Sequence, residues 1–224
     1  MADIFQEVDE IIKQERMERF WKENARLIIA FIVITIVGTA CISFYKSWNT
    51  SVKQAQTTTL IALFDKPDFA QNAVEDTADL RGGLRGIGLL GAAKTAQENN
   101  DTELALKNYK AAAEDNNIPD EFRSLADLMV VKLSSDLNAK QKLDILQSIS
   151  SDDESPWKSH ARIEAALIYA HDLNNFSEAR KQLAEIKAGE AVAPGIIETA
   201  KKLDHVYAVQ QSKTPSAKTE DDKS

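Results

Sequence analysis

The longest apolar stretch of the chain is a run of nineteen residues without a charge, from Leu27 to Tyr45. As an α-helix, this run would be about 28 Å long, close to the hydrocarbon thickness of a bilayer. Aromatic residues flank it, with Phe20 and Trp21 before it and Tyr45 and Trp48 at its end, as is typical of membrane interfaces. The pattern predicts a transmembrane helix over residues 27–45. A buried core helix or strand is the alternative, but such elements rarely extend this far with no residue more polar than Thr or Ser.

Basic residues are distributed unevenly around this run. Only Lys46 and Lys53 follow it closely, whereas five precede it: Lys13, Arg16, Arg19, Lys22 and Arg26. This asymmetry predicts a cytoplasmic N-terminus and a C-terminal domain on the opposite, extracytoplasmic side of the membrane. A signal peptide cleaved before Cys41 is the competing interpretation. The first 26 residues carry seven acidic side chains and the apolar run is long for a signal core, so a retained anchor is favoured.

The first 26 residues are polar but patterned. Five apolar residues fall on one side when the segment is drawn as a helix, which indicates an amphipathic helix: Ile4, Phe5, Val8, Ile11 and Ile12. This face has two interpretations. It lies against the membrane surface, or it docks on a cytoplasmic or membrane partner.

Downstream of the run, the pattern is helical throughout, and no window shows the sustained alternation of a strand. Residues 46–66 continue as a helical stalk, and residues 67–81 add a short lead-in helix. Pro119, Pro156 and Pro194 lie 37 and 38 residues apart, and each opens a segment with apolar residues at helical spacing, as proline does in a first turn. Two helices in a period of this length predict helical-hairpin repeats.

The second helix of each hairpin carries a shared pattern. Ala105, Tyr109 and Ala112 stand at i, i+4 and i+7, and the same spacing returns 74 residues later in a second set: Ala179, Leu183 and Ile186. This arrangement resembles the small and large packing positions of tetratricopeptide repeats. The middle unit fits poorly, because Lys142 occupies the position of the small residue. We therefore expect an all-α fold with a tetratricopeptide-like domain over residues 82–211 and a disordered tail over residues 212–224.

A second motif, "GIGLLG" at residues 86–91, has the G-x-G-x-x-G spacing of dinucleotide-binding loops. Such a loop needs a hydrophobic strand before it and an acidic residue on a later strand. Here a polar, helix-like segment enters the motif and a helical hairpin follows. We expect Gly86, Gly88 and Gly91 to serve turns and close helix packing, and no nucleotide cofactor to bind.

Other chemistry has little support. The net charge of −8 argues against nucleic acid, which is bound by concentrated Lys and Arg. His160, His171 and His205 lack metal-ligand spacing, and we expect His160 and His171 to be solvated or helix-capping residues. Three acids, Asp152, Asp153 and Glu154, precede a predicted helix and favour its start through the helix dipole. We predict no enzyme, catalytic residue, metal site, cofactor or small-molecule substrate.

Two segments resemble a known family. The opening "DIFQEVDEIIKQERMERFWKENARLIIAFIV" and the later "SPWKSHARIEAALIYAHDLNNFSEAR" are similar to bacterial inner-membrane proteins with a tetratricopeptide-like extracytoplasmic domain, especially those of alphaproteobacteria. That family is related to the ancillary subunit of the SecYEG translocon. The resemblance implies a single-span protein of the inner membrane, with a periplasmic role near translocon subunits, chaperones and emerging secreted chains, and it transfers no catalytic residue.

Together these observations predict a membrane-anchored adaptor or chaperone-like protein that binds polypeptide on its repeat surface. The alternative is a structural scaffold that tethers an envelope or cell-division complex without binding clients.

Overall fold

The computed structural model describes residues 2–186 and 192–213, apart from the side chains of residues 2–12, 14, 25, 28, 29 and 32. The described residues form nine α-helices and no strand. The prediction of an all-α fold is therefore confirmed for this part of the chain.

Helix α1 runs from Ala2 to Phe64 and includes the long apolar run and the predicted stalk. The described large apolar side chains of this run are exposed, among them Leu27 at 71% and Phe31 at 72%. A search of the described residues finds no helix that is both long enough and apolar enough to cross a membrane. The side chains of residues 28, 29 and 32 of the predicted span lie outside the described ones, and the span stays a prediction.

The same is true of the apolar face predicted near the N-terminus. Its backbone is helical, but its side chains lie outside the described ones: Ile4, Phe5, Val8, Ile11 and Ile12. The choice between a membrane-surface helix and a docking helix therefore stays open.

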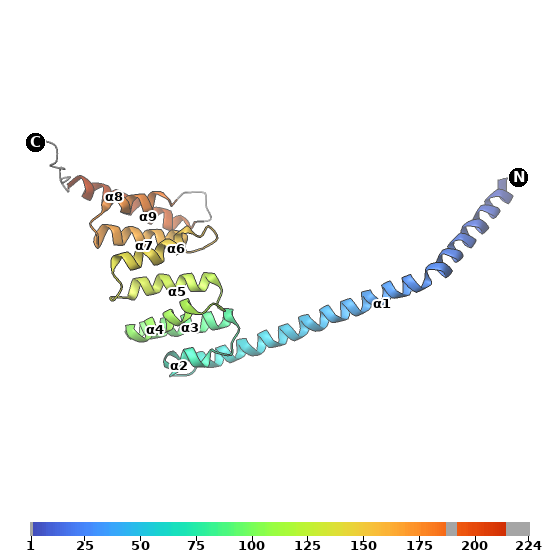
Figure 1. Cartoon of the computed structure of the whole chain (residues 1–224), viewed down its shortest axis with the longest axis horizontal. Helices are drawn as coiled ribbons and strands as arrows, with labels where there is room; N and C mark the ends of the chain where they lie inside the picture. Colours follow the sequence, from blue (N-terminus) through green and yellow to red (C-terminus); the bar gives the residue numbers. More distant parts are fainter. Residues whose placement is uncertain (1, 187–191, 214–224) are drawn as a thin grey trace, which may run out of the picture. The chain divides into compact units, whose positions relative to one another are not determined.

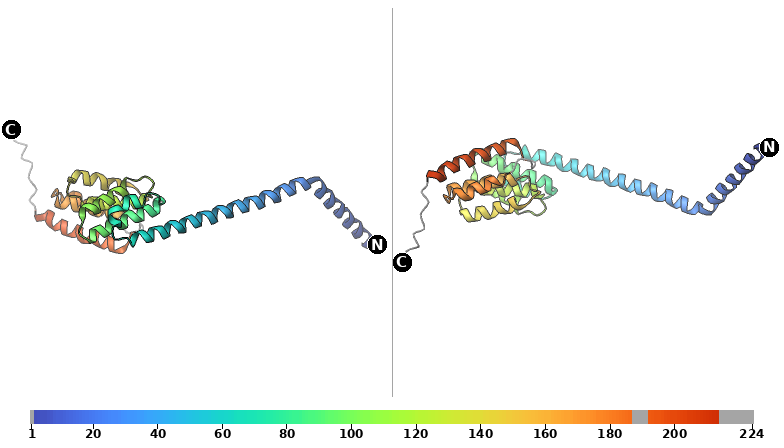
Figure 2. Two further views of the ribbon diagram at one scale, coloured as in Figure 1. Left: turned by 90° about the horizontal axis from the view of Figure 1, so that it is seen from below. Right: turned by 90° about the horizontal axis from the view of Figure 1, so that it is seen from above.

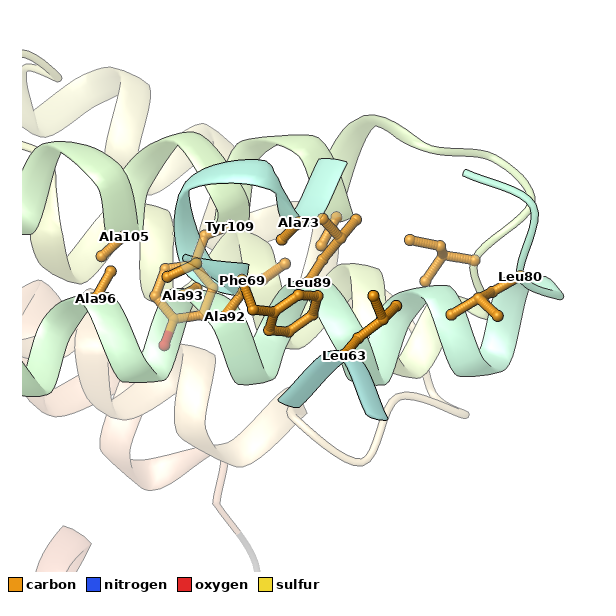
Figure 3. Close-up of a cluster of buried hydrophobic side chains, with 14 of the residues drawn as sticks. Leu63, Phe69, Ala73, Leu80, Leu89, Ala92, Ala93, Ala96, Ala105 and Tyr109 are labelled. Carbon is orange, nitrogen blue, oxygen red and sulfur yellow. The ribbon is translucent and has the colours of Figure 1, made fainter. Parts of the chain in front are cut away.

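The chain divides into two compact units, one up to Ala55 and the other from Gln56. The second unit starts well before residue 82, where the repeat domain was expected to begin. Leu60 and Leu63 of α1 and Phe69 of α2 are buried in the same core as the first hairpin (Figure 3), so the lead-in segment is part of the folded domain.

The second unit is a stack of helical hairpins (Figure 1). Consecutive helices pack against each other from α2 to α9, and two further views show α8 lying beside α9 (Figure 2). The helices are α2 (Phe69–Asp76), α3 (Gly82–Glu98), α4 (Thr102–Glu114), α5 (Asp120–Leu133), α6 (Ala139–Ser151), α7 (Lys158–His171), α8 (Phe176–Ala184) and α9 (Pro194–Lys213). Residues 212 and 213, expected in the disordered tail, are the end of α9, and residues 214–224 lie outside the described ones.

The repeat has a period of 37 residues, visible in the caps of the second helices. Asp101, Asn138 and Asn175 are the N-cap residues of α4, α6 and α8, and each side chain accepts a hydrogen bond from a backbone N–H of the first turn. Asn100 and Asn174, before two of these caps, have φ angles of 61° and 52°. Asn tolerates this left-handed backbone conformation, so two turns of the same shape recur 74 residues apart.

Three core clusters follow one another along the stack, because α5 and α7 each bury two faces. In α5, Ala126 and Val130 pack toward α3 and α4, whereas Leu128 and Val131 pack toward α6 and α7. In α7, Ala161 and Ala165 belong to the middle cluster and Ala166 to the last. Each hairpin therefore buries apolar surface only against its neighbours, which is how helical repeats are stabilised.

The glycines of the G-x-G-x-x-G motif lie inside α3. A Cβ on Gly86 would come within 2.9 Å of the Ile118 side chain. A Cβ on Gly88 would meet Thr77 at 2.8 Å, and one on Gly91 would meet the Phe64 ring at 2.5 Å. These close approaches explain why α3 uses residues that are otherwise poor helix formers: α1, α2 and the start of α5 pack directly on its backbone.

Candidate functional site

A groove follows one side of the second unit, across the ends of several helices. It consists of three hollows of about 270, 90 and 800 Å³. The first two share Asp120, Ser124 and Asp152, and the last two share Glu154, Ser155 and Pro156. The hollows are therefore contiguous, and the groove runs from Ala113 of α4 past the starts of α5 and α7 to Ile196 of α9.

The groove is acidic. Among the described residues, six carboxylates line it: Asp120, Glu121, Asp127, Asp152, Asp153 and Glu154. Two cationic residues of the same described part also line it, and both are paired. The Nη2 atom of Arg123 lies 2.8 Å from Oδ1 of Asp120, and the Nζ atom of Lys158 lies 2.5 Å from Oδ1 of Asp153. The groove therefore has a surplus of negative charge, which suits a partner with Lys or Arg side chains.

Asp127 is half-buried, whereas the other five carboxylates of the groove are exposed. Burial raises the pKa of Asp127 above its ordinary value, Arg123 opposes the shift, and Glu114 adds to it. A carboxylate held in its charged form at such a position costs stability. In contrast, the pKa of Asp153 is lowered, chiefly by its hydrogen bond with Lys158.

Trp157 connects the two helices that form the middle of the groove. Its indole Nε1 donates a hydrogen bond of 2.7 Å to the backbone oxygen of Glu121, and its ring packs against the core formed by α5, α6 and α7. The residue is the N-cap of α7. It therefore fixes the start of α7 relative to the start of α5, 36 residues earlier.

One of the sequence interpretations needs correction here, and another is extended. Asp152, Asp153 and Glu154 precede α7, as expected, and their effect on its dipole stays a prediction. Asp152 is also the C-cap of α6, and Trp157 is the N-cap of α7. The acids form the turn between these helices, where they line the groove. His160 is not a solvated residue: it is half-buried with its ring centroid 5.4 Å from that of Trp157, and no described residue gives its buried Nδ1 a hydrogen bond.

The other two histidines lie away from the groove. His205 is exposed on α9. His171 ends α7, and its Nε2 lies 3.4 Å from the hydroxyl oxygen of Tyr207. Among the described residues, no group of His, Cys, Asp and Glu side chains could hold a metal ion.

The six residues predicted to pack the repeats lie in the core and do not line the groove. Ala105 and Ala112 are fully buried, as is Ala179, and Ala105 points toward Ala96 of α3 (Figure 3). Tyr109 and Leu183 are also buried, and Ile186 is buried just beyond the end of α8 at Ala184. In the middle unit, Lys142 is half-buried, but Leu146 and Ile149 occupy the equivalent buried positions.

The groove residues of α5 were missed by sequence reasoning. Asp120, Arg123 and Asp127 follow helical spacing on the polar side of an amphipathic helix, which is also the pattern of an ordinary solvated face. The starts of α5 and α7 are far apart in the sequence. No local pattern therefore indicated that the polar side of α5 forms a groove together with the start of α7.

Comparison with known families gives one result. The family model described as a tetratricopeptide repeat-like domain matches residues 18–180, which is more than half of the chain. No curated protein and no solved structure matches the chain. The match begins within α1 and ends within α8, so it includes the helices that form most of the groove.

Proposed function

We propose that this chain, which belongs to the family of tetratricopeptide repeat-like domains, is a membrane-anchored adaptor that binds extended polypeptide in its acidic groove. The observation that carries the proposal is the groove itself, which crosses three helical hairpins and has six carboxylates on its walls. Repeat domains of this kind are protein-interaction modules, and no chemistry is required of the groove beyond binding.

The groove favours a partner in an extended conformation. Its three hollows are contiguous but shallow, so they fit a chain that lies along them better than a compact ligand. Carboxylates attract Lys and Arg side chains and raise the rate of encounter more than the final affinity. The adaptor would therefore hold clients weakly and release them readily, which is what a chaperone-like factor needs.

The anchor in this proposal is the run from Leu27 to Tyr45. Its support is the absence of charge over nineteen residues and the exposure of its large side chains, for example Ile34 at 69% and Phe44 at 76%. Bulky apolar side chains exposed on many sides of one helix are stable in lipid and unfavourable in water. The uneven basic residues around the run favour a cytoplasmic N-terminus. The resemblance to inner-membrane proteins implies that the groove then lies on the periplasmic side.

The location near the Sec translocon rests on the resemblance of the opening segment to a family related to its ancillary subunit. An anchor would keep the groove close to secreted chains as they leave the translocon. This raises the effective concentration of the groove around its clients without any new contact.

Site-specific crosslinking in cells tests the proposal. A photoreactive amino acid at Ser124 would stand inside the groove, and the same amino acid at exposed Lys107 on α4 is the matched control, because Lys107 lines none of the three hollows. We expect secreted precursors and translocon subunits at position 124 and few or none at position 107.

The alternative function is a scaffold that tethers an envelope or cell-division complex. A scaffold would give one fixed partner at position 124, whether or not secretion is blocked. That result, or equal crosslinking at both positions, would overturn the adaptor proposal.

The topology has its own test. Alkaline phosphatase fused after Trp48 should be active if the chain leaves the cytoplasm within residues 27–45. An inactive fusion would contradict the proposed orientation.

A further inference from the structure

We propose that two copies of this chain pair in parallel through one face of α1. The face consists of eight residues, here called the seam: Phe31, Ile34, Gly38, Cys41, Tyr45, Trp48, Val52 and Ala55. They are separated by alternating steps of three and four residues. This is the 3.5-residue period that brings two helices together over several turns in a left-handed pair.

The seam is most distinct at its polar end, where apolar residues are rare. Between residues 46 and 55, the other side chains are Lys, Ser, Asn, Thr and Gln, and the three that are apolar are Trp48, Val52 and Ala55. All three lie on the seam. Trp48 and Ala55 are exposed and Val52 is half-buried, so the stretch presents one apolar stripe on an otherwise polar helix.

The same register continues into the apolar run, where it meets small residues. Gly38 has open space where a Cβ would stand, and Cys41 is exposed. Small residues at a helix contact let two backbones approach closely. Bulky seam residues, Ile34 and Tyr45, flank this narrow part at either end.

The distribution of charge favours a second copy as the occupant. Between residues 27 and 55 the charged side chains are Lys46 and Lys53. Each follows the first residue of a three-residue step of the seam, Tyr45 or Val52, and therefore lies on the outer side of a paired helix. The positions beside the seam are uncharged, for example Asn49 and Ser51, so two identical helices can meet in parallel without like-charge repulsion.

The parallel direction rests on the membrane anchor of the proposed function. Two copies inserted with the same orientation share one plane, and confinement in that plane raises their effective concentration. The pair would present two grooves to the same client, which compensates for weak binding by each.

Cysteine crosslinking in native membranes tests the pair. The chain has one cysteine, Cys41, and identical seam residues of a parallel pair meet within the Cα separation that a disulfide needs, about 4.4–6.8 Å. We expect mild oxidation to convert the full-length protein into a disulfide-linked dimer, and Cys41→Ser to abolish that dimer.

A matched pair of variants then defines the face. In the Cys41→Ser background, Val52→Cys should restore the dimer, whereas Lys53→Cys, one residue later, should leave the protein monomeric. Equal amounts of dimer from both variants, or no dimer from either Cys41 or Val52→Cys, would overturn the seam.

Alkaline carbonate extraction of the same membranes separates the two proposals. Protein that stays in the membrane without seam crosslinks overturns only the pair, and protein that is extracted overturns the anchor and the pair together.

Discussion

Trp157 donates a hydrogen bond from its indole Nε1 to the backbone oxygen of Glu121, over a distance of 2.7 Å. The two residues are the N-cap of α7 and a first-turn residue of α5. Through this bond the starts of two first helices, one repeat apart, are held together at the middle of the groove. The groove thus depends on a contact between repeats as well as on packing within each hairpin.

Trp157→Phe should therefore reduce client binding in the groove more than it reduces the stability of the fold. The change keeps an aromatic ring against the core but removes the hydrogen bond, and we expect a loss of about 1 kcal/mol in the free energy of unfolding. Urea unfolding of residues 56–213 measures it. Crosslinking at Ser124 in cells should fall in the same variant, and unchanged stability together with unchanged crosslinking would contradict the role of Trp157.

Gly82 and Gly83 should respond in opposite directions to alanine. A Cβ on Gly82 would lie 1.6 Å from the backbone oxygen of Asn117, whereas nothing lies within 4 Å of a Cβ on Gly83. Gly82→Ala must therefore displace backbone and should lower the melting temperature strongly. Gly83→Ala should raise the stability by about 0.5–1 kcal/mol, because Ala is the better helix former. Thermal unfolding of both variants tests this prediction. A melting temperature of Gly82→Ala near that of the parent would show that the turn between α4 and α5 packs less tightly on Gly82 than the structure indicates.

Leucine at the small positions of the second helices should overpack the hairpins. Ala179 of α8 is fully buried in a cluster with residues of α7 and α9. Ala179→Leu should therefore lower the free energy of unfolding by about 1–3 kcal/mol, and so should Ala105→Leu. Lys142→Leu is the matched control at the equivalent position of the middle repeat, where a long side chain is already accommodated. We expect its melting temperature to stay near that of the parent. Equal effects of the two changes would mean that the 37-residue alignment is wrong.

The sequence was sufficient for the helices and for the repeat register, because both depend on local signals. Proline at the starts of α5 and α9, Asn and Asp at the caps, and apolar residues at helical spacing all lie in or next to the element they define. The groove could not be predicted in this way. Its walls come from the end of α4, from α5, the end of α6, the start of α7 and the start of α9. The polar residues among them would look the same on an ordinary solvated surface.

The start of α7 shows the same limit. Asp152, Asp153 and Glu154 precede this helix, as predicted, but Pro156, expected in its first turn, lies before the N-cap residue Trp157. The indole of Trp157 donates its hydrogen bond to the backbone oxygen of Glu121 in another repeat. Local signals cannot reveal a partner that lies 36 residues away.

Asp127→Asn should stabilise the domain at neutral pH and weaken client binding. Burial raises the pKa of the Asp127 carboxyl, so the folded state holds the proton more tightly than the unfolded chain, where the pKa is about 3.9. Stability must then fall as the pH rises from about 3.9 through the raised pKa, and the full penalty is present at neutral pH. Asn carries no charge, so the variant avoids the penalty.

The gain in melting temperature should accordingly be largest near neutral pH, shrink as the pH falls through the raised pKa, and vanish below about 3.9. Asp120→Asn is the control in the same groove: its carboxylate is mostly exposed and paired with Arg123, and an exposed ion pair contributes about 0–1 kcal/mol. Thermal unfolding of residues 56–213 across this pH range gives the answer. A constant difference between Asp127→Asn and the parent at every pH would show that the effect comes from packing and not from the charge. If the gain does depend on pH, the domain keeps a carboxylate that its own fold disfavours, and reduced crosslinking at Ser124 in Asp127→Asn would identify the binding of a cationic client as the reason.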